Sequence, residues 1–416
     1  MKKVLCIFPL AFLACFVSVH AVEGRSVPSL LSSRRLSPTT ISKQVCRVHN
    51  AFLKYSKVLF IMPSMPVGGI ERAFADTIQK LPLPSTQFDV CLLNRGLPFE
   101  KELKSDTHLI SFEEACQNRY AAVVSFHHAL PLSRWIFQIK AKRRLQVIHT
   151  DLNGWGKDWL FKSAKQRKKI SAFIAVSQRA AKSFKKFYPK DVKKLHTIYN
   201  VIDSDRITTL SARLAEGILA SPSLSVVSVC RISGEKALDR AIRIHKKLDN
   251  NGFHFKWYVV GGGDDILRKQ LETMVVANGL VGKFIFLGEK TNPYPYIKRA
   301  DIFAFLSYFE GWGVVTTEAK ILHRPIIVTD VGGAREQIRS ETNGLIVANN
   351  DDAIYKGMKR LLQDGTLRQK FTTALEGYTY DNAKILKKLM GLCFAREKKL
   401  RDHKETAMSA SPHNNP

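Results

Sequence analysis

Two glutamates eight residues apart are the most informative chemical signal in this sequence of 416 residues. Glu310 opens a turn in which Gly311 and Gly313 flank Trp312, and Glu318 follows in the helix that this pattern predicts. The turn comes after an apolar run, so its glycines would expose Glu310 and several backbone amides at the carboxyl end of a strand, with Glu318 about two helical turns further on. One carboxylate would then contact a sugar while the other accepts hydrogen bonds from ribose hydroxyls. The alternative is an ordinary surface helix that carries two glutamates.

Two basic residues, Arg231 and Lys236, bracket a short loop that follows another apolar run. Both side chains can reach one diphosphate there, the guanidinium as a fork and the ammonium as a point charge. Gly68 and Gly69 lie between an expected strand and helix, where glycine permits close backbone approach and the helix N-terminus favours phosphate. The alternatives are a solvated loop for the basic pair and a tight turn that merely needs glycine.

No motif of the sequence indicates a bound metal ion or a redox cofactor. The glycines at 261–263 lack the G-x-G-x-x-G spacing of nicotinamide-binding folds. Asp203 and Asp205 have the D-x-D form that metal-dependent transferases use, but they lie between the two halves of the chain, where Asp203 more readily caps or orders a turn. The seven scattered cysteines include no C-x-x-C pair and indicate neither a zinc ribbon nor a disulfide framework. We therefore expect no metal and no cofactor.

The elements that would position these residues are short apolar runs that alternate with helical patterns. Runs of this kind are typical of strands buried on both faces of a parallel sheet. They fall in two successive sets, at 57–62, 88–93, 121–125, 145–149, 172–176 and 195–199, and then at 224–230, 257–260, 284–287, 302–306 and 326–329. The pattern predicts two doubly wound α/β domains, at 51–203 and 204–375, that face one another across a cleft. Ligands of such sheets bind beyond the carboxyl ends of the strands, so the site is expected in this cleft.

The two ends of the chain differ in composition from these domains. Lys2 and Lys3 precede an apolar run from Val4 to Val19, and Ala21 follows as a small residue suited to signal cleavage, so residues 1–21 have the form of a secretory signal or a retained anchor. Residues 22–50 have the composition of a linker. A helical segment is expected at 376–400, followed by a mobile tail at 401–416.

The charge of the chain is strongly positive, with 65 Lys and Arg against 36 Asp and Glu and a formal net charge of +29. About half of this surplus lies between 134 and 194, where basic helices with apolar edges are expected at 159–170 and 178–188. We interpret this segment as a surface that docks on anionic lipid. A solvated basic face is the alternative, and because no nucleic-acid motif accompanies the charge, we expect no nucleic-acid partner. The 45% apolar content excludes a disordered or small stapled protein.

The stretch from Glu310 to Glu318 resembles the E-x7-E motif of the retaining group 1 glycosyltransferases of family 4, which have the GT-B fold. The likeness covers roughly residues 57–393. It includes Gly68 and Gly69, Arg231 and Lys236, and the segments 176–177, 198–203, 300–303, 324–336 and 343–345. Two departures are a missing glycine after Asn200 and Leu306-Ser307 in place of a frequent Pro-Ser.

This resemblance implies transfer of a hexose from a UDP-sugar or GDP-sugar to a hydroxyl acceptor, with the anomeric configuration kept and without a metal. Arg231 and Lys236 would offset the charge of the diphosphate, which grows as the glycosidic bond breaks. Glu310 would contact the donor sugar and Glu318 the ribose, and His149 would contact the sugar or the acceptor. The segment at 376–400 would cross back to the first domain, as it does in relatives. The donor would also meet the glycine-rich turns, namely Gly68, Gly69, Gly311, Trp312 and Gly313.

We expect the acceptor to be a lipid-linked or lipopolysaccharide-type saccharide at a membrane surface. The sequence leaves two other functions open, a catalytically silent GT-B-like scaffold and an exported basic binding protein. Nucleotide sugars are made in the cytosol, and Arg25, Arg34 and Arg35 follow the apolar leader. We therefore expect the catalytic body on the cytoplasmic face of a membrane, peripheral or anchored by its N-terminus, with export as the alternative.

Overall fold

The computed structural model describes residues 57–127, 134–154, 163–215 and 223–395, all of which belong to one unit, Tyr55–Pro416. The expected leader, linker and tail lie outside these residues. In the described part of the chain, no helix combines the length and the apolar character needed to cross a membrane.

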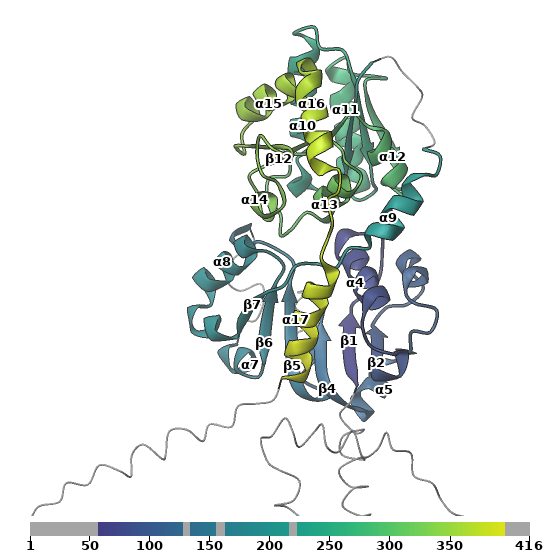
Figure 1. Ribbon diagram of the computed structural model, residues 1–416, viewed down its shortest axis with the longest axis vertical. Coiled ribbons are helices and arrows are strands. Elements are labelled where there is room, and N and C mark those ends of the chain that lie inside the picture. The colour runs from purple at the N-terminus through teal and green to yellow at the C-terminus, as the bar shows by residue number, and fades with distance from the viewer. Residues whose placement is uncertain (1–56, 128–133, 155–162, 216–222, 396–416) are drawn as a thin grey trace, which may run out of the picture. The chain divides into compact units, whose positions relative to one another are not determined.

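The first domain contains a sheet of seven parallel strands in the order β3-β2-β1-β4-β5-β6-β7 (Figure 1). Every residue of β1 is buried, because its side chains alternate between two covered faces. The strands are β1 (Val58–Met62), β2 (Phe88–Leu92), β3 (Leu109–Ile110), β4 (Arg119–Ser125), β5 (Lys140–Ile148), β6 (Ala172–Ala175) and β7 (Leu195–Thr197). The helices are α4 (Gly69–Lys80), α5 (Phe112–Gln117), α7 (Ala164–Lys168) and α8 (Gln178–Phe187), with 3-10 turns η1 (Ser85–Gln87), η2 (Pro98–Glu102), η3 (Leu152–Gly154) and η4 (Pro189–Lys194).

The second domain repeats this design with six parallel strands in the order β10-β9-β8-β11-β12-β13. The strands are β8 (Ser225–Val229), β9 (Lys256–Val260), β10 (Phe284–Gly288), β11 (Ile302–Phe305), β12 (Ile326–Thr329) and β13 (Leu345–Val347). The helices are α10 (Leu238–Asp249), α11 (Asp265–Ala277), α12 (Tyr294–Arg299), α13 (Val314–Ile321), α14 (Ala334–Gln337), α15 (Asp351–Gln363) and α16 (Gly365–Leu375), with η5 (Gly234–Lys236) before α10. The predicted class, two doubly wound Rossmann-like domains, is confirmed.

Two segments connect the domains. Helix α9 (Ser204–Ser211) leads from the first domain to the second, and α17 (Asn382–Phe394) returns to pack on β4 and β5 (Figure 1). Helix α17 buries Ile385, Leu386 and Leu389 in the same apolar cluster that contains the cores of β1 and β11. The domains therefore share one continuous apolar core.

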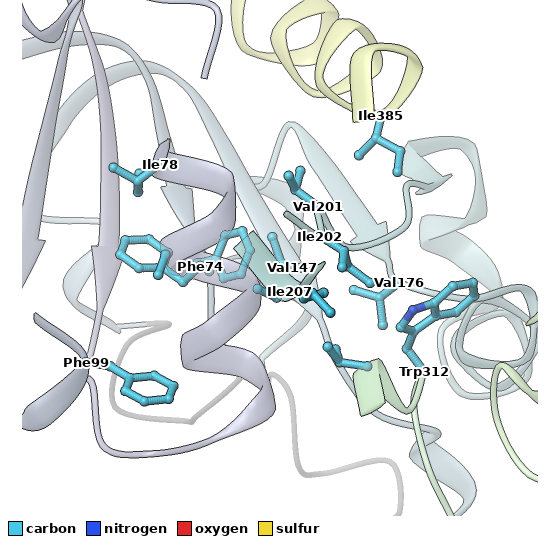
Figure 2. Packing of buried hydrophobic residues seen from close by; sticks show 14 of the residues in the cluster. Phe74, Ile78, Phe99, Val147, Val176, Val201, Ile202, Ile207, Trp312 and Ile385 are labelled. Atoms are coloured by element: carbon cyan, nitrogen blue, oxygen red, sulfur yellow. The ribbon is translucent and has the colours of Figure 1, made fainter. Parts of the chain in front are cut away.

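This shared core reaches the interface between the domains. Figure 2 shows Phe74 and Ile78 of α4 in one cluster with Val147 of β5 and with Ile202 and Ile207 of the connecting segment. Phe74 and Ile78 lie four residues apart, on the face of α4 that points inward. The packing fixes α4, and with it the glycine turn at its N-terminus, close to the second domain.

Polar contacts on the opposite side of the interface add to this packing. The carboxylate of Glu336 accepts hydrogen bonds from the backbone N–H of Gln178 at 2.8 and 2.9 Å. Arg179 donates to the carbonyl oxygen of Asp330 at 3.0 Å. The N-terminus of α8 is therefore bonded directly to the loop before α14 and to α14 itself.

Candidate active site

Lys236 and Glu310 form an ion pair at the carboxyl edge of the second sheet. Lys236 ends η5 after β8, and Glu310 lies in the turn after β11. Strands β8 and β11 are hydrogen-bonded neighbours, so the loops that follow them leave the sheet side by side. Ser307 donates to the same oxygen, Oε1 of Glu310, at 3.1 Å. Held by a cation and a hydroxyl, the carboxylate of Glu310 can accept hydrogen bonds from the hydroxyl groups of a ligand.

Arg231 lies in the loop after β8 and is far more exposed than Lys236. Two-thirds of its side chain is open to solvent, against 14% for Lys236. Its guanidinium lies 3.5 Å from Oε1 of Glu235, which Ser233 holds through a hydrogen bond of 2.7 Å. Arg231 is thus free to turn toward a ligand, whereas Lys236 is fixed.

Two adjoining cavities join these residues to the first domain. One has an empty volume of about 1140 Å³, including its open mouth, and is lined by nine of the predicted residues: Gly68, Gly69, His149, Arg231, Lys236, Glu310, Gly311, Trp312 and Gly313. The other, of about 660 Å³, shares Gly68, Gly69 and Arg231 and adds the tenth, Glu318. Together the cavities have the size of a small-molecule site and are walled by both domains.

Close backbone approach explains two of the glycines. A Cβ built on Gly311 would overlap the carbonyl oxygen of His149, at the end of β5. Gly313 has φ +71°, which favours glycine, and a Cβ there would lie 2.9 Å from the ring of Phe305. Gly311 therefore permits close contact between the domains, and Gly313 permits close packing within the second domain.

His149 lines the larger cavity as a neutral imidazole. It is buried, and its Nε2 lies 2.8 Å from the carbonyl oxygen of Phe126, which fits an Nε2–H donor. Burial and the nearby His127 lower the pKa of His149 to about 3. His149 therefore adds a polar group to the wall without a positive charge.

Glu318 belongs to a buried network at the smaller cavity. The hydroxyl of Tyr294 donates to Oε1 of Glu318 at 3.2 Å, and Arg206 of α9 donates to that hydroxyl at 3.0 Å. Arg206 also donates to Oδ1 of Asp76 in α4 at 3.1 Å. Burial raises the pKa of Glu318 to about 7, although Arg206 and Arg72 lower it in part.

Several residues of these cavities were not predicted from the sequence. Glu71, His127 and Arg72 line the walls beside the predicted glycines, and Tyr294 and Arg206 hold Glu318. A charged residue two positions after Gly69, at the start of the expected helix, was a usable signal for Glu71. No local pattern marks Tyr294 or Arg206.

Asp203 of the D-x-D pattern makes structural contacts. Asp203 caps α9 by accepting from the backbone N–H of Arg206 at 3.2 Å, and it pairs with Lys80 at 3.0 Å. Within the described ranges, no cluster of three or more His, Cys, Asp or Glu side chains is arranged to hold a metal ion.

Comparisons with known proteins concern the family and the fold of the chain. Residues 218–376 match the family model described as "Glycosyl transferases group 1". The chain is 30% identical over 207 residues to the N-acetylgalactosamine-N,N'-diacetylbacillosaminyl-diphospho-undecaprenol 4-alpha-N-acetylgalactosaminyltransferase of Campylobacter jejuni, covering 48% of this chain and 54% of that protein. It is 29% identical over 148 residues to the lipopolysaccharide core biosynthesis glycosyltransferase LpsD of Rhizobium meliloti, covering 35% and 41%. The chain thus spans about half the length of the curated relatives it matches.

A solved structure supports the fold over both domains. The Anabaena protein HepE, in complex with UDP and glucose, superposes with a TM-score of 0.69 at 16% identity, covering 82% of this chain and all of that one. At this identity the likeness concerns the fold alone. From the family match over residues 218–376, we conclude that the second domain belongs to the group 1 glycosyltransferases, and the two Rossmann-like domains of the described chain have the GT-B fold.

Proposed function

We propose that this protein transfers a hexose from a UDP-sugar or GDP-sugar to a hydroxyl of a lipid-linked or lipopolysaccharide-type saccharide, with the anomeric configuration kept. The observation that carries the proposal is the shared cavity wall of Arg231, Lys236 and Glu310, which faces the N-terminus of α4. Two cations and a helix N-terminus suit a diphosphate, and a carboxylate beside them suits sugar hydroxyls.

We place the diphosphate of the donor between Arg231 and Lys236. As the bond to the sugar breaks, negative charge grows on the leaving phosphate, and preorganised cations in a partly enclosed site stabilise that charge. Lys236 is already fixed by Glu310, so little reorganisation is needed. Arg231 completes the site by closing on the bound donor.

The two carboxylates contact different parts of the nucleotide sugar. Glu310 accepts hydrogen bonds from hydroxyls of the transferred sugar, while Glu318, deeper in the smaller cavity, accepts them from the ribose. His149, on the wall from the first domain, contacts the sugar or the incoming acceptor. No step requires a metal.

The acceptor class is supported by the relatives. One of them is named for a diphospho-undecaprenol saccharide and another for lipopolysaccharide core biosynthesis. We extend this class to the present chain because its first domain carries a basic surface. We call six exposed lysines of this domain the basic face. They are Lys165 and Lys168 of α7, Lys169 directly after it, and Lys182, Lys185 and Lys186 of α8.

The basic face would dock on anionic lipid through charge alone. Phe184, on the apolar edge of α8, is fully buried and packs against Phe173 with a ring-centroid distance of 4.8 Å. The apolar edge of this helix thus serves the core and does not insert into lipid. Of the expected helix at 159–170, the described residues show only α7, and residues 155–162 lie outside them.

We place the catalytic body on the cytoplasmic face of a membrane, where nucleotide sugars are made. A reporter that is active only outside the cytoplasm, fused after Pro416, tests this placement. A silent reporter supports it, and a strong signal contradicts it.

Thermal shift against UDP-sugars and GDP-sugars, followed by an assay of transfer, tests the function. A ligand at about 100 times its dissociation constant stabilises the fold by about 2.7 kcal/mol. We expect one donor to do so and to be consumed with retention at the anomeric carbon, seen by NMR of the product. Binding without transfer would instead support the silent scaffold.

A further inference from the structure

A third cavity between the domains shares only Trp312 with the larger cavity of the candidate site. Its empty volume is about 1150 Å³, including the open part. Its walls come from the first domain at β7 and α8, from α13 and α14 of the second, and from the segment that leads into α17. None of the proposed donor contacts uses this space.

The most unusual group in its wall is the ammonium of Lys320. Lys320 is only 5% exposed, and its Nζ donates to the carbonyl oxygen of Gln337 at 2.7 Å and lies 3.9 Å from the ring centroid of Tyr378. No carboxylate of the described residues pairs with it. An ammonium has three donors, and a buried cation without a counter-ion is costly, so it favours an anion. Burial accordingly lowers the pKa of Lys320 to about 8.

A second polar group in the wall lacks a partner. Trp312 is 95% buried, and within the described residues its indole N–H has no hydrogen-bond acceptor. The ring stacks on Tyr199, with centroids 4.6 Å apart, and Figure 2 shows it in the apolar cluster that also contains Ile385 of α17. A ligand in the cavity can therefore meet aromatic surface.

The carboxylates of the cavity are already engaged. Glu336 accepts from the backbone N–H of Gln178, and Asp381 accepts from the backbone N–H of Lys384 at 2.9 Å, as the cap of α17. Lys384 and Lys388 line the exposed rim. The wall carries three ammonium groups, of Lys320, Lys384 and Lys388, against the two carboxylates, so positive charge is in excess in this space.

We propose that the cavity is a binding site for an acidic sugar, that is, a pyranose that carries a phosphate or a carboxylate. The anionic group pairs with Lys320 and Lys384, and the sugar ring lies against the aromatic walls of Tyr378 and Tyr380. A free sugar phosphate and an acidic residue of a glycan share this chemistry. The inference does not depend on the proposed transfer reaction.

Calorimetric titration of the full chain with glucose 6-phosphate, glucuronate, glucose and inorganic phosphate tests the site. The Arg231→Ala, Lys236→Ala double variant serves as host, so that the proposed diphosphate site does not contribute. We expect both acidic sugars to bind at least tenfold more tightly than glucose and than inorganic phosphate. The stronger of the two identifies the source, a sugar phosphate or an acidic glycan residue.

Substitutions in this host locate the binding. Lys320→Met should weaken binding of the acidic sugars at least tenfold, without a loss in thermal stability, because it removes a buried charge. Lys384→Met should weaken it less, and Lys387→Met, an exposed residue of the same helix outside the cavity, should change nothing. The proposal is overturned if glucose or inorganic phosphate binds as tightly as the acidic sugars, or if no probe binds. It is also overturned if a folded Lys320→Met chain binds the acidic sugars as tightly as the host does.

Discussion

Gly311 of the donor turn lies directly against the backbone carbonyl of His149. The two residues come from different domains, and no side chain could stand between them. The contact sets how closely the turn with Glu310 approaches the end of β5, and therefore the width of the candidate site.

We predict that Gly311→Ala pushes the two domains apart at this point. Overpacking of this kind typically costs about 1–3 kcal/mol, so the thermal midpoint should fall. Transfer should fall more than tenfold, because small displacements of reacting groups are costly. Gly391→Ala in α17 is the matched control, since a Cβ there meets nothing within 4 Å. Equal activity of both variants would show that the contact does not set the site.

Donor binding is predicted to depend on pH through Glu318, whose pKa burial raises to about 7. As the pH falls through 7, the ligand-free protein takes up a proton there and loses a hydrogen-bond acceptor for the ribose. Affinity for the nucleotide sugar, measured between pH 5.5 and 8, should therefore weaken at the acid end. A UDP-sugar is the suitable probe, since its diphosphate does not titrate in this range.

Glu318→Gln should bind the donor more weakly and without this pH dependence. The same raised pKa means that ionising Glu318 costs folding stability as the pH rises from 4.5 through 7. The stability of Glu318→Gln should lack that slope. An unchanged pH profile of binding in the variant would exclude Glu318 as its source.

Acid should destabilise the second domain through His245. This residue is fully buried and stacks on Phe255 with a centroid distance of 4.2 Å. Burial lowers its pKa to about 4, so between about 6.5 and 4 the unfolded chain binds more protons than the folded one. Stability is therefore lost as the pH falls through this window. Urea unfolding of His245→Phe should show a shallower loss, whereas the exposed His254→Gln should resemble the parent.

The basic face is predicted to bind vesicles that contain anionic lipid. Each lysine near the surface contributes roughly 1 kcal/mol, and high salt should release the protein. Changing Lys165, Lys168 and Lys169 to Gln should reduce sedimentation with vesicles and leave donor affinity intact. The control changes three exposed lysines of the second domain, Lys269, Lys356 and Lys370. Equal losses of vesicle binding in both variants would show that these lysines form only a solvated face.

Much of the fold was predictable because each strand carries its own signal. The run Val58–Met62 is apolar at every position, as a strand covered on both faces must be. The return of α17 to the first sheet has no such local mark; it depends on where Ile385 and Leu389 find apolar partners.

The candidate site was predictable to the extent that its residues follow strands. Glu310, Arg231 and Lys236 stand after β11 and β8, and the carboxyl edge of a sheet gathers such residues. The ion pair between Glu310 and Lys236 requires β8 and β11 to be neighbours, which local sequence does not encode. The same holds for the contact of Gly311 with His149, where we expected the glycine to expose amides to a ligand.

The most direct test of the account compares binding and turnover in Arg231→Ala and Lys236→Ala. The charge of the leaving diphosphate peaks in the transition state, so turnover should fall by about 10²–10³-fold in each variant. The dissociation constant of the donor sugar, measured on the same preparations, should change much less. Turnover within a few-fold of the parent in both variants would contradict the assignment of the diphosphate to Arg231 and Lys236.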